Sequence, residues 1–177
     1  SLMKITLDGW KLKVRHLLHL LHLSKRHNGG MPVQELPDYF DGIIEILTTY
    51  IEHKTDHFTL QTYGGDYING PYVQALQEHD NILLIEAISN EFLVPELSEH
   101  GQQAMVFMGW RFFPERYLPN YAQFIDQSQL SPREIAIKMA QALHFAYGVD
   151  DTFSFEIAPR LDVAEKQITR MGLIRTN

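Results

Sequence analysis

The feature that most constrains the fold is a run of three strand-like segments in the middle of the chain. "HFTLQTY" (57–63) and "PYVQALQ" (71–77) alternate side chains that favour opposite faces of a strand. "NILLIEAIS" (81–89) is more continuously apolar, as expected of a buried central strand. The second and third segments are joined by the short stretch "EHDN", which fits a hairpin. The sequence therefore predicts that these two strands are antiparallel neighbours.

Two helical segments are predicted around these strands. "LPDYFDGIIEILTTYIEH" (36–53) carries one apolar stripe, formed by Phe40, Ile43, Ile44, Leu47 and Ile51. After the third strand, Ser98 can cap a short helix that Gly109 stops.

The last long helix has the clearest boundaries. Ser131, Pro132 and Glu134 supply a cap, a first-turn proline and a capping-box acid, and Gly148 supplies a left-handed stop.

Further short strands complete the predicted fold. "WRFF" (110–113) and "YAQFID" (121–126) precede the last helix, and "DTFSFEI" (151–157) is expected to add an edge strand. The core order is helix, three strands, helix, two strands, helix. This order predicts an α+β domain with one mostly antiparallel sheet packed against helices.

The two ends of the chain differ in charge from the body. Residues 1–27 hold six Lys and Arg against one acid, a net charge of +5. Residues 28–159 hold five against nineteen, a net of −14, and residues 160–177 hold four against two, a net of +2. An acidic body disfavours nucleic acid and anionic membranes as partners, because phosphates attract clustered Lys and Arg.

The charge and composition suggest three segments. Residues 1–30 form a basic extension, with a hairpin at Asp8-Gly9 and then an amphipathic helix. Residues 31–159 form a single domain, and residues 160–177 form a tail or short helix. The chain has no cysteine and no apolar run long enough to span a membrane, so we expect a cytoplasmic protein.

The histidines do not form a convincing metal site. On a helix, His16 and His22 lie about 9 Å apart along the axis, too far for a shared ion. His53 and His57 bracket the end of a helix, where regular spacing fails. We therefore expect no metal, although a site of two histidines stays open at either place.

No catalytic motif or cofactor motif is present. The sequence lacks phosphate-binding glycine loops, metalloprotease and kinase signatures, and the serine-hydrolase elbow. A solvated acidic face explains Glu86, Glu91, Glu96 and Glu99 better than a carboxylate pair does. We expect no enzyme activity and no cofactor.

Five short stretches of the sequence, taken in their order along the chain, resemble the TY-Chap/YbjN family, which has the fold of type III secretion chaperones. They are "YVQAL" (72–76), "EAISNEFLVP" (86–95), "LSEHGQQAMVFMGW" (97–110), "NYAQFID" (120–126) and "ALHFAYGV" (142–149). The resemblance covers roughly residues 34–150. It implies a secretion-chaperone-like fold and a chaperone-like or adaptor-like, non-catalytic protein that is often dimeric.

The residues that carry this resemblance are expected to have structural roles. They are Tyr72, Val73, Gln74, Glu86, Ser89, Asn90, Gly109, Trp110, Asn120, Tyr147 and Gly148. Trp110 should fill the space beside the short helix, and Gly109 should make a turn that a side chain would strain. Tyr72 and Tyr147 should be half-buried, with hydroxyls that reach backbone or water.

Three functions remain open from the sequence. The favoured one is a homodimeric module that binds a protein partner or client along a sheet edge or in an apolar groove. The second is a regulator that binds a small ligand between the sheet and the helices. The third is an enzyme whose site is assembled from scattered residues.

Overall fold

The computed structural model describes residues 3–6, 35–161 and 175–176. Its helices are η3 (Asp38–Phe40), α2 (Asp41–Glu52), α3 (Glu99–Phe107), η4 (Pro114–Arg116), α4 (Pro132–Gln141) and η5 (Ala142–Ala146). Its strands are β1 (Met3–Thr6), β2 (His57–Tyr63), β3 (Tyr72–His79), β4 (Ile82–Ala87), β5 (Arg111–Phe113), β6 (Leu118–Asp126), β7 (Ser154–Ala158) and β8 (Arg175–Thr176).

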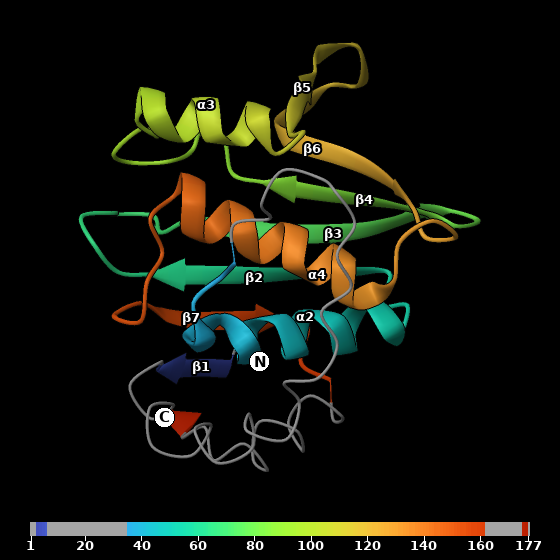
Figure 1. Cartoon of the computed structure of the whole chain (residues 1–177), viewed down its shortest axis with the longest axis horizontal. Helices are drawn as coiled ribbons and strands as arrows, with labels where there is room; N and C mark the ends of the chain where they lie inside the picture. The colour runs from blue at the N-terminus through green and yellow to red at the C-terminus, as the bar shows by residue number, and fades with distance from the viewer. Residues whose placement is uncertain (1–2, 7–34, 162–174, 177) are drawn as a thin grey trace.

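The strands form one antiparallel sheet in the order β5-β6-β4-β3-β2-β7-β1-β8 (Figure 1). Six of them, β2 to β7, lie between residues 57 and 158, and the short strands β1 and β8 extend the sheet at one side. The predicted α+β class, the core order of elements and the hairpin between β3 and β4 are confirmed.

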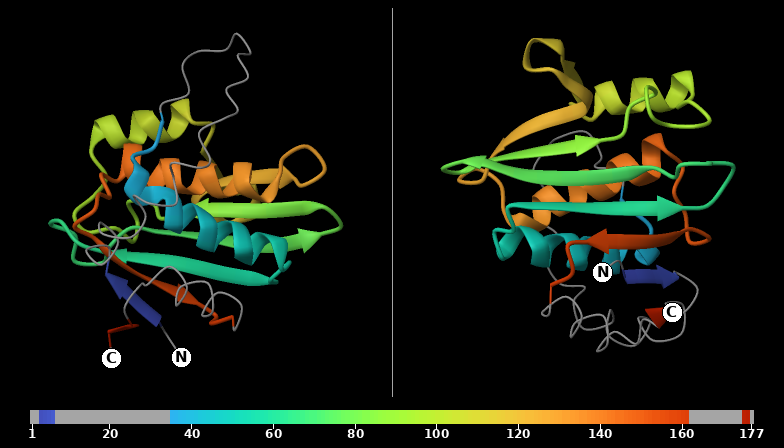
Figure 2. Two further views of the ribbon diagram at one scale, coloured as in Figure 1. Left: turned by 60° about the horizontal axis from the view of Figure 1, so that its bottom comes forward. Right: turned by 180° about the vertical axis from the view of Figure 1, so that it is seen from behind.

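The helices lie on one face of the sheet. In Figure 1, α2 and α4 run across the front of the strands and α3 lies beside the β4 and β6 end. Seen from behind in Figure 2, the described helices leave the other face uncovered. The core lies between α2, α4 and the sheet, where Phe40, Leu47 and Phe58 are fully buried.

Close backbone contact holds α3 against the helix that follows α4. A Cβ atom added to Gly101 would lie 2.6 Å from the carbonyl oxygen of Ala146, which is closer than real contacts allow. Glycine at this position therefore lets α3 pack directly on η5.

The predicted helix signals are in place. The Ser98 side chain accepts a hydrogen bond from the backbone N–H of Gly101, and Ser131 and Glu134 form a capping box at the start of α4. Gly109 and Gly148 have φ angles of +86° and +70°, which favour glycine. The last helix differs in one respect: α4 ends at Gln141 and continues as the π-helical turn η5.

The expectation that residues 151–157 form an edge strand is wrong. Strand β7 pairs with β2 on one side and with β1 on the other, so it lies inside the sheet. Its alternating burial fits either position, and only the distant partner β1 decides between them.

Parts of the predicted ends lie outside the described residues. Of the hairpin at Asp8-Gly9 the structure describes β1, which pairs with β7 and β8. The amphipathic helix after it lies outside, as do residues 162–174 of the predicted tail or short helix. None of the described helices has the length and apolar character needed to cross a membrane.

Candidate functional site

Strand β6 has an uncovered edge over its second half. Strand β5 lies at the end of the sheet order and pairs with β6 only from Leu118, opposite Phe113, to Ala122, opposite Arg111. Residues 123–126 of β6 continue the pairing with β4. On their other side, no strand of the described chain pairs with them. An uncovered edge presents backbone donors and acceptors to a further strand.

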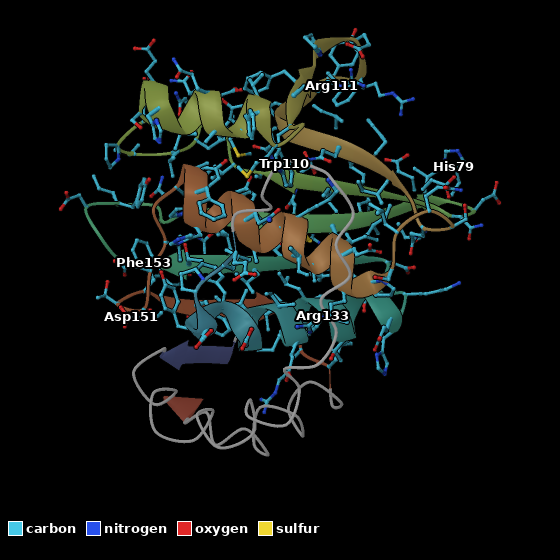
Figure 3. The ribbon with its side chains drawn as sticks, viewed as in Figure 1. His79, Trp110, Arg111, Arg133, Asp151 and Phe153 are labelled. Carbon is cyan, nitrogen blue, oxygen red and sulfur yellow. The ribbon has the colours of Figure 1, made fainter. Side chains whose placement is uncertain are left out.

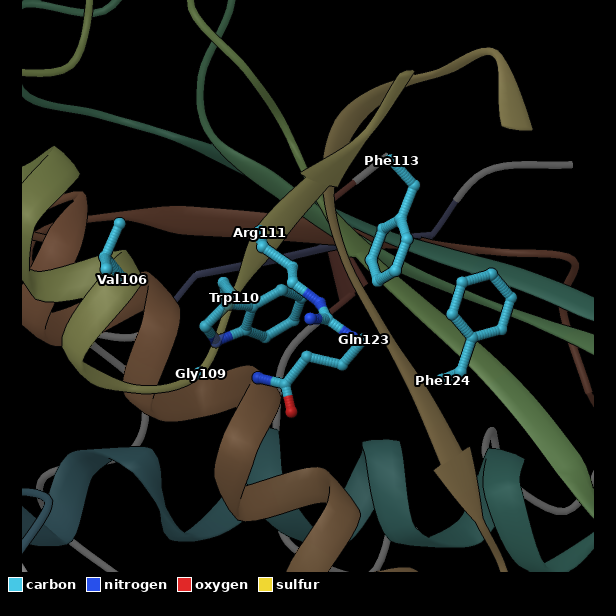
Figure 4. A pocket seen from close by; sticks show the side chains of 7 residues that line it. All are labelled: Val106, Gly109, Trp110, Arg111, Phe113, Gln123 and Phe124. Atoms are coloured by element: carbon cyan, nitrogen blue, oxygen red, sulfur yellow. The ribbon is translucent and has the colours of Figure 1, made fainter. Parts of the chain in front are cut away.

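A pocket of about 390 Å³ lies at this edge, between the end of α3 and strand β6 (Figure 4). Its lining comes from three elements and the turn after α3: Val106, Gly109, Trp110, Arg111, Phe113, Gln123 and Phe124. Val106 is 68% exposed, so its side chain is open to contact with a ligand. The Gln123 amide donates a hydrogen bond to the carbonyl oxygen of Met108, at 3.2 Å, which fixes the turn after α3 against β6.

The lining aromatic rings are stacked with two arginines. Phe113 and Phe124 make an edge-to-face contact, with ring centroids 5.0 Å apart. The Arg111 guanidinium lies 4.7 Å from the Phe113 ring centroid, and that of Arg116 lies 4.4 Å from the Phe124 centroid. These are cation–π distances, so the arginines extend the apolar surface of the rings and keep their N–H donors at its border.

The indole of Trp110 forms a buried wall of the pocket. Its side chain is 1% exposed, and its Nε1–H has no hydrogen-bond partner among the described residues. Figure 4 shows the ring among the other lining side chains, with Val106 on one side and Gln123 on the other. A buried donor without an acceptor costs about 1–3 kcal/mol.

Five of the residues singled out from the sequence are joined by hydrogen bonds on and beside strands β3, β4 and β6. The Glu86 carboxylate is 7% exposed and accepts hydrogen bonds from the Gln74 amide at 2.7 Å and the Asn120 amide at 3.4 Å. The Asn120 amide also donates to the Tyr72 hydroxyl at 3.1 Å, and its oxygen accepts from the backbone N–H of Ser89 at 3.3 Å. We call Tyr72, Gln74, Glu86, Ser89 and Asn120 the polar cluster.

The polar cluster joins strands β3, β4 and β6 and does not resemble a reactive site. Burial raises the pKa of the Tyr72 hydroxyl, the nearby Glu86 raises it further, and the hydrogen bond from Asn120 opposes both. The Ser89 hydroxyl is buried without a partner in the described part of the chain.

The other residues singled out from the sequence are spread over the fold. Tyr147 is 2% exposed, more buried than expected, and its hydroxyl donates to the carbonyl oxygen of Ile88 at 2.5 Å. Burial raises the pKa of this hydroxyl well above its usual value. Asn90 accepts from the backbone N–H of Leu97 at 2.7 Å. Val73 is fully buried on β3, and Gly148 ends the last helical segment.

Of the eleven residues named from the sequence, Gly109 and Trp110 line the pocket. The sequence reasoning missed the other lining residues, Val106, Arg111, Phe113, Gln123 and Phe124. A signal for them was present: Arg111 and Arg116 are the only Lys or Arg between residues 55 and 132, and they stand among aromatics in "WRFFPERY".

The described histidines do not gather into a metal site. Nδ1 of His53 lies 2.8 Å from the carbonyl oxygen of Thr49, in the last turn of α2. Within the described ranges, no group of three or more His, Asp or Glu side chains could hold a metal ion. The histidine-rich stretch from His16 to His27 lies outside the described residues.

A family comparison matches the region that holds this edge and pocket. Residues 45–156 match the model of TY-Chap3, described as T3SS (YopN, CesT) and YbjN peptide-binding chaperone 3. The chain belongs to the TY-Chap3 family. The matched region runs from within α2 to within β7 and confirms the family resemblance and secretion-chaperone-like fold expected from the sequence. No curated protein and no solved structure matched the chain.

Proposed function

We propose that this TY-Chap3 protein binds an extended segment of a client protein along the uncovered edge of β6. Residues 123–126 of β6 lie beside a pocket lined by Val106, Trp110 and Phe124, and this observation carries the proposal. The family is one of peptide-binding chaperones, which implies protein clients. The proposed role is binding without catalysis, and the client is unidentified.

The geometry suits peptide recognition by strand addition. In this mode, backbone hydrogen bonds to a sheet edge supply affinity, and pockets for alternate side chains supply specificity. The β6 edge offers the backbone groups, and the pocket offers room for a side chain next to them.

A small ligand is the alternative occupant, because the pocket volume of about 390 Å³ lies within the usual range for ligand sites. The sequence placed such a site between the sheet and the helices. The pocket described here lies instead at the β6 edge and the end of α3, where an extended chain can also reach it.

Hydrogen exchange tests the proposed strand addition directly. The probe is a nine-residue peptide, blocked at both ends, in which valine alternates with glutamine. Binding should slow exchange of backbone amides within residues 123–126, because a strand partner protects them. Unchanged exchange there in the presence of saturating peptide, or protection confined to another strand, would refute the proposal.

A variant of the pocket supplies the second test. Val106→Gln should weaken binding of the same peptide by about five-fold, since it removes roughly 1 kcal/mol of apolar contact. Ile68→Gln is the matched control, because Ile68 is 77% exposed and does not line the pocket. Equal effects of the two variants on the peptide Kd would count against a site at the pocket.

We also propose that the protein is a cytoplasmic homodimer. The dimer has support from large apolar side chains that are exposed on α3 and β5, among them Phe107 and Phe112. These side chains are next in sequence to lining residues and do not line the pocket themselves, so self-association and client binding can use neighbouring surfaces.

A further inference from the structure

A strand added along β6 would present its side chains to two different environments. Successive side chains of a strand point to opposite faces of the sheet. Gln123 lies on the helix-covered face together with the ends of α3 and Trp110, since its neighbours Tyr121 and Ile125 belong to the core. Phe124 lies on the other face, together with Phe113 and the two stacked arginines.

The arginines make this second environment positive. Arg111 and Arg116 are exposed, and neither forms an ion pair among the described residues. Between residues 55 and 132 they are the only Lys or Arg, against ten Asp and Glu. An exposed arginine that is already held over an aromatic ring can pair with a carboxylate at a smaller cost in side-chain entropy.

Two acids lie on η4 and β6, the elements that carry Arg116 and Phe124. Glu115 lies between the arginines in sequence, on η4, and Asp126 ends β6. The Asp126 carboxylate accepts hydrogen bonds from the backbone N–H and the hydroxyl of Ser128, at 2.9 and 2.6 Å, so it is engaged in the turn after β6. Neither Glu115 nor Asp126 forms an ion pair with Arg111 or Arg116 among the described residues, so the two guanidinium groups are available to a ligand.

We infer that the client segment bound at the β6 edge alternates apolar and acidic residues. Its apolar side chains lie toward Val106 and Trp110, and its carboxylates lie toward Arg111 and Arg116. This inference rests on the proposed function, because it specifies the peptide that the β6 edge accepts. It also disfavours basic segments, including the chain's own residues 1–27 with their net charge of +5.

Four blocked nine-residue peptides test the inference. In three of them valine alternates with glutamate, glutamine or lysine, and the fourth has the composition of the glutamate peptide with valines and glutamates in separate blocks. Blocked ends exclude a terminal carboxylate as the recognised group. We expect affinity to fall from the glutamate peptide to the glutamine peptide by about five- to ten-fold, as two exposed charge pairs are lost. It should fall further to the lysine peptide.

The fourth peptide, in which valines and glutamates stand in separate blocks, distinguishes recognition of the alternating pattern from simple charge attraction. It carries the same net charge as the alternating glutamate peptide, so long-range attraction is equal. We expect it to bind at least several-fold more weakly, because a strand at the β6 edge cannot place its valines on one face and its carboxylates on the other. Equal binding of these two peptides would overturn the inference.

Charge variants test whether Arg111 and Arg116 are the residues that recognise the peptide carboxylates. The double variant Arg111→Gln and Arg116→Gln should bind glutamate and glutamine peptides with equal affinity, and the double reversal to Glu should favour the lysine peptide. Arg133→Gln is the matched control, since Arg133 lies on α4 away from Arg111 (Figure 3). This control should keep the preference for glutamate.

The outcomes distinguish failure of the inference from failure of the proposed function. If none of the alternating peptides protects the amides of residues 123–126 from exchange, strand addition itself is refuted. If all of them bind there with equal affinity, or if the double glutamine variant keeps the preference for glutamate, strand addition stands and the acidic specificity is refuted.

Discussion

At the scale of single residues, the polar cluster shows how hydrogen bonds from neutral side chains satisfy a buried carboxyl group. Glu86 sits on central strand β4 with 7% of its surface exposed, and its partners are neutral amides, Gln74 and Asn120. Asn120 is the residue that connects the others, because it also binds the Tyr72 hydroxyl and the backbone of Ser89. Replacement of Asn120 should therefore affect all three strands.

Asn120→Asp should destabilise the protein in a pH-dependent way. It places a second carboxylate where an amide now lies 3.4 Å from Glu86, and two carboxylates in one buried site resist joint ionisation. The pKa of the variant pair rises above that of the unfolded chain. The loss of about 2–3 kcal/mol at pH 7 should therefore shrink as the pH is lowered toward 5. Urea unfolding of the variant and of the unaltered protein at several pH values measures this difference in the free energy of unfolding.

Asn120→Ala is the control for this prediction. It removes all the hydrogen bonds of the Asn120 side chain without adding a charge, so it should cost about 1–3 kcal/mol at both pH values. If the aspartate variant showed no greater sensitivity to pH than the alanine variant, the side chain at position 120 would not lie against the buried Glu86 carboxyl group as described.

At the scale of elements, local signals in the sequence predict where a segment starts and stops, and long-range pairing decides where it lies. Residues 57–63 were predicted as a strand with the bounds that β2 has, because alternation and flanking turns are local. The position of β7 was missed, since pairing with β1 joins residues about 150 positions apart. The alternating burial of β7 is the same whether one or two strands pair with it, so it does not predict the position of β7 in the sheet.

The capping box of α4 gives an element-scale prediction. Ser131→Ala should cost about 1 kcal/mol, because the side chain of Ser131 accepts the hydrogen bond of the Glu134 backbone N–H at 3.2 Å. Chemical unfolding measures the loss, and hydrogen exchange should rise first in the opening turn of α4. Ser154→Ala, on strand β7, is a control outside any cap. If the denaturant concentration at the midpoint of unfolding were the same for Ser131→Ala as for the unaltered protein, the assigned cap would be contradicted.

Acid should weaken the same region of the chain. Hydrogen bonds to Ser131 lower the pKa of Glu134, and hydrogen bonds to Ser128 lower the pKa of Asp126, so both carboxylates stabilise the fold when ionised. This contribution is full above the unfolded-state pKa values, near 4, and is lost as the pH falls through the lower folded values. Between pH 5 and pH 3, Glu134→Gln should lose less stability than the unaltered protein.

The candidate site was less predictable than the fold. The pocket exists because β5 stops pairing opposite Ala122 while β6 runs on to Asp126, and this difference in length is a property of two strands together. Trp110 and Gly109 were named from the sequence for structural reasons. Their neighbours Val106 and Phe124 come from other elements, and only the fold brings them to one place.

At the scale of the whole molecule, one group of exposed apolar side chains lies at the α3 and β5 end. Val106, Phe107, Phe112 and Tyr117 are 68%, 78%, 48% and 93% exposed. Exposed apolar groups that gather in one region mark interaction surfaces more often than scattered ones do. In a two-fold dimer the same surface would meet its own copy, so one substitution changes both halves of the interface.

Phe107→Glu should therefore convert the proposed homodimer to a monomer, because it places like charges opposite each other at the interface. Light scattering and sedimentation measure the mass, and Ile68→Glu, an equally exposed apolar position at 77%, should leave it unchanged. Since Phe107 does not line the pocket, the monomeric variant should keep its affinity for the alternating glutamate peptide. Loss of the dimer and of peptide binding together would show that two copies build the site. A monomeric unaltered protein would refute the dimer and leave the β6 edge as a site within one chain.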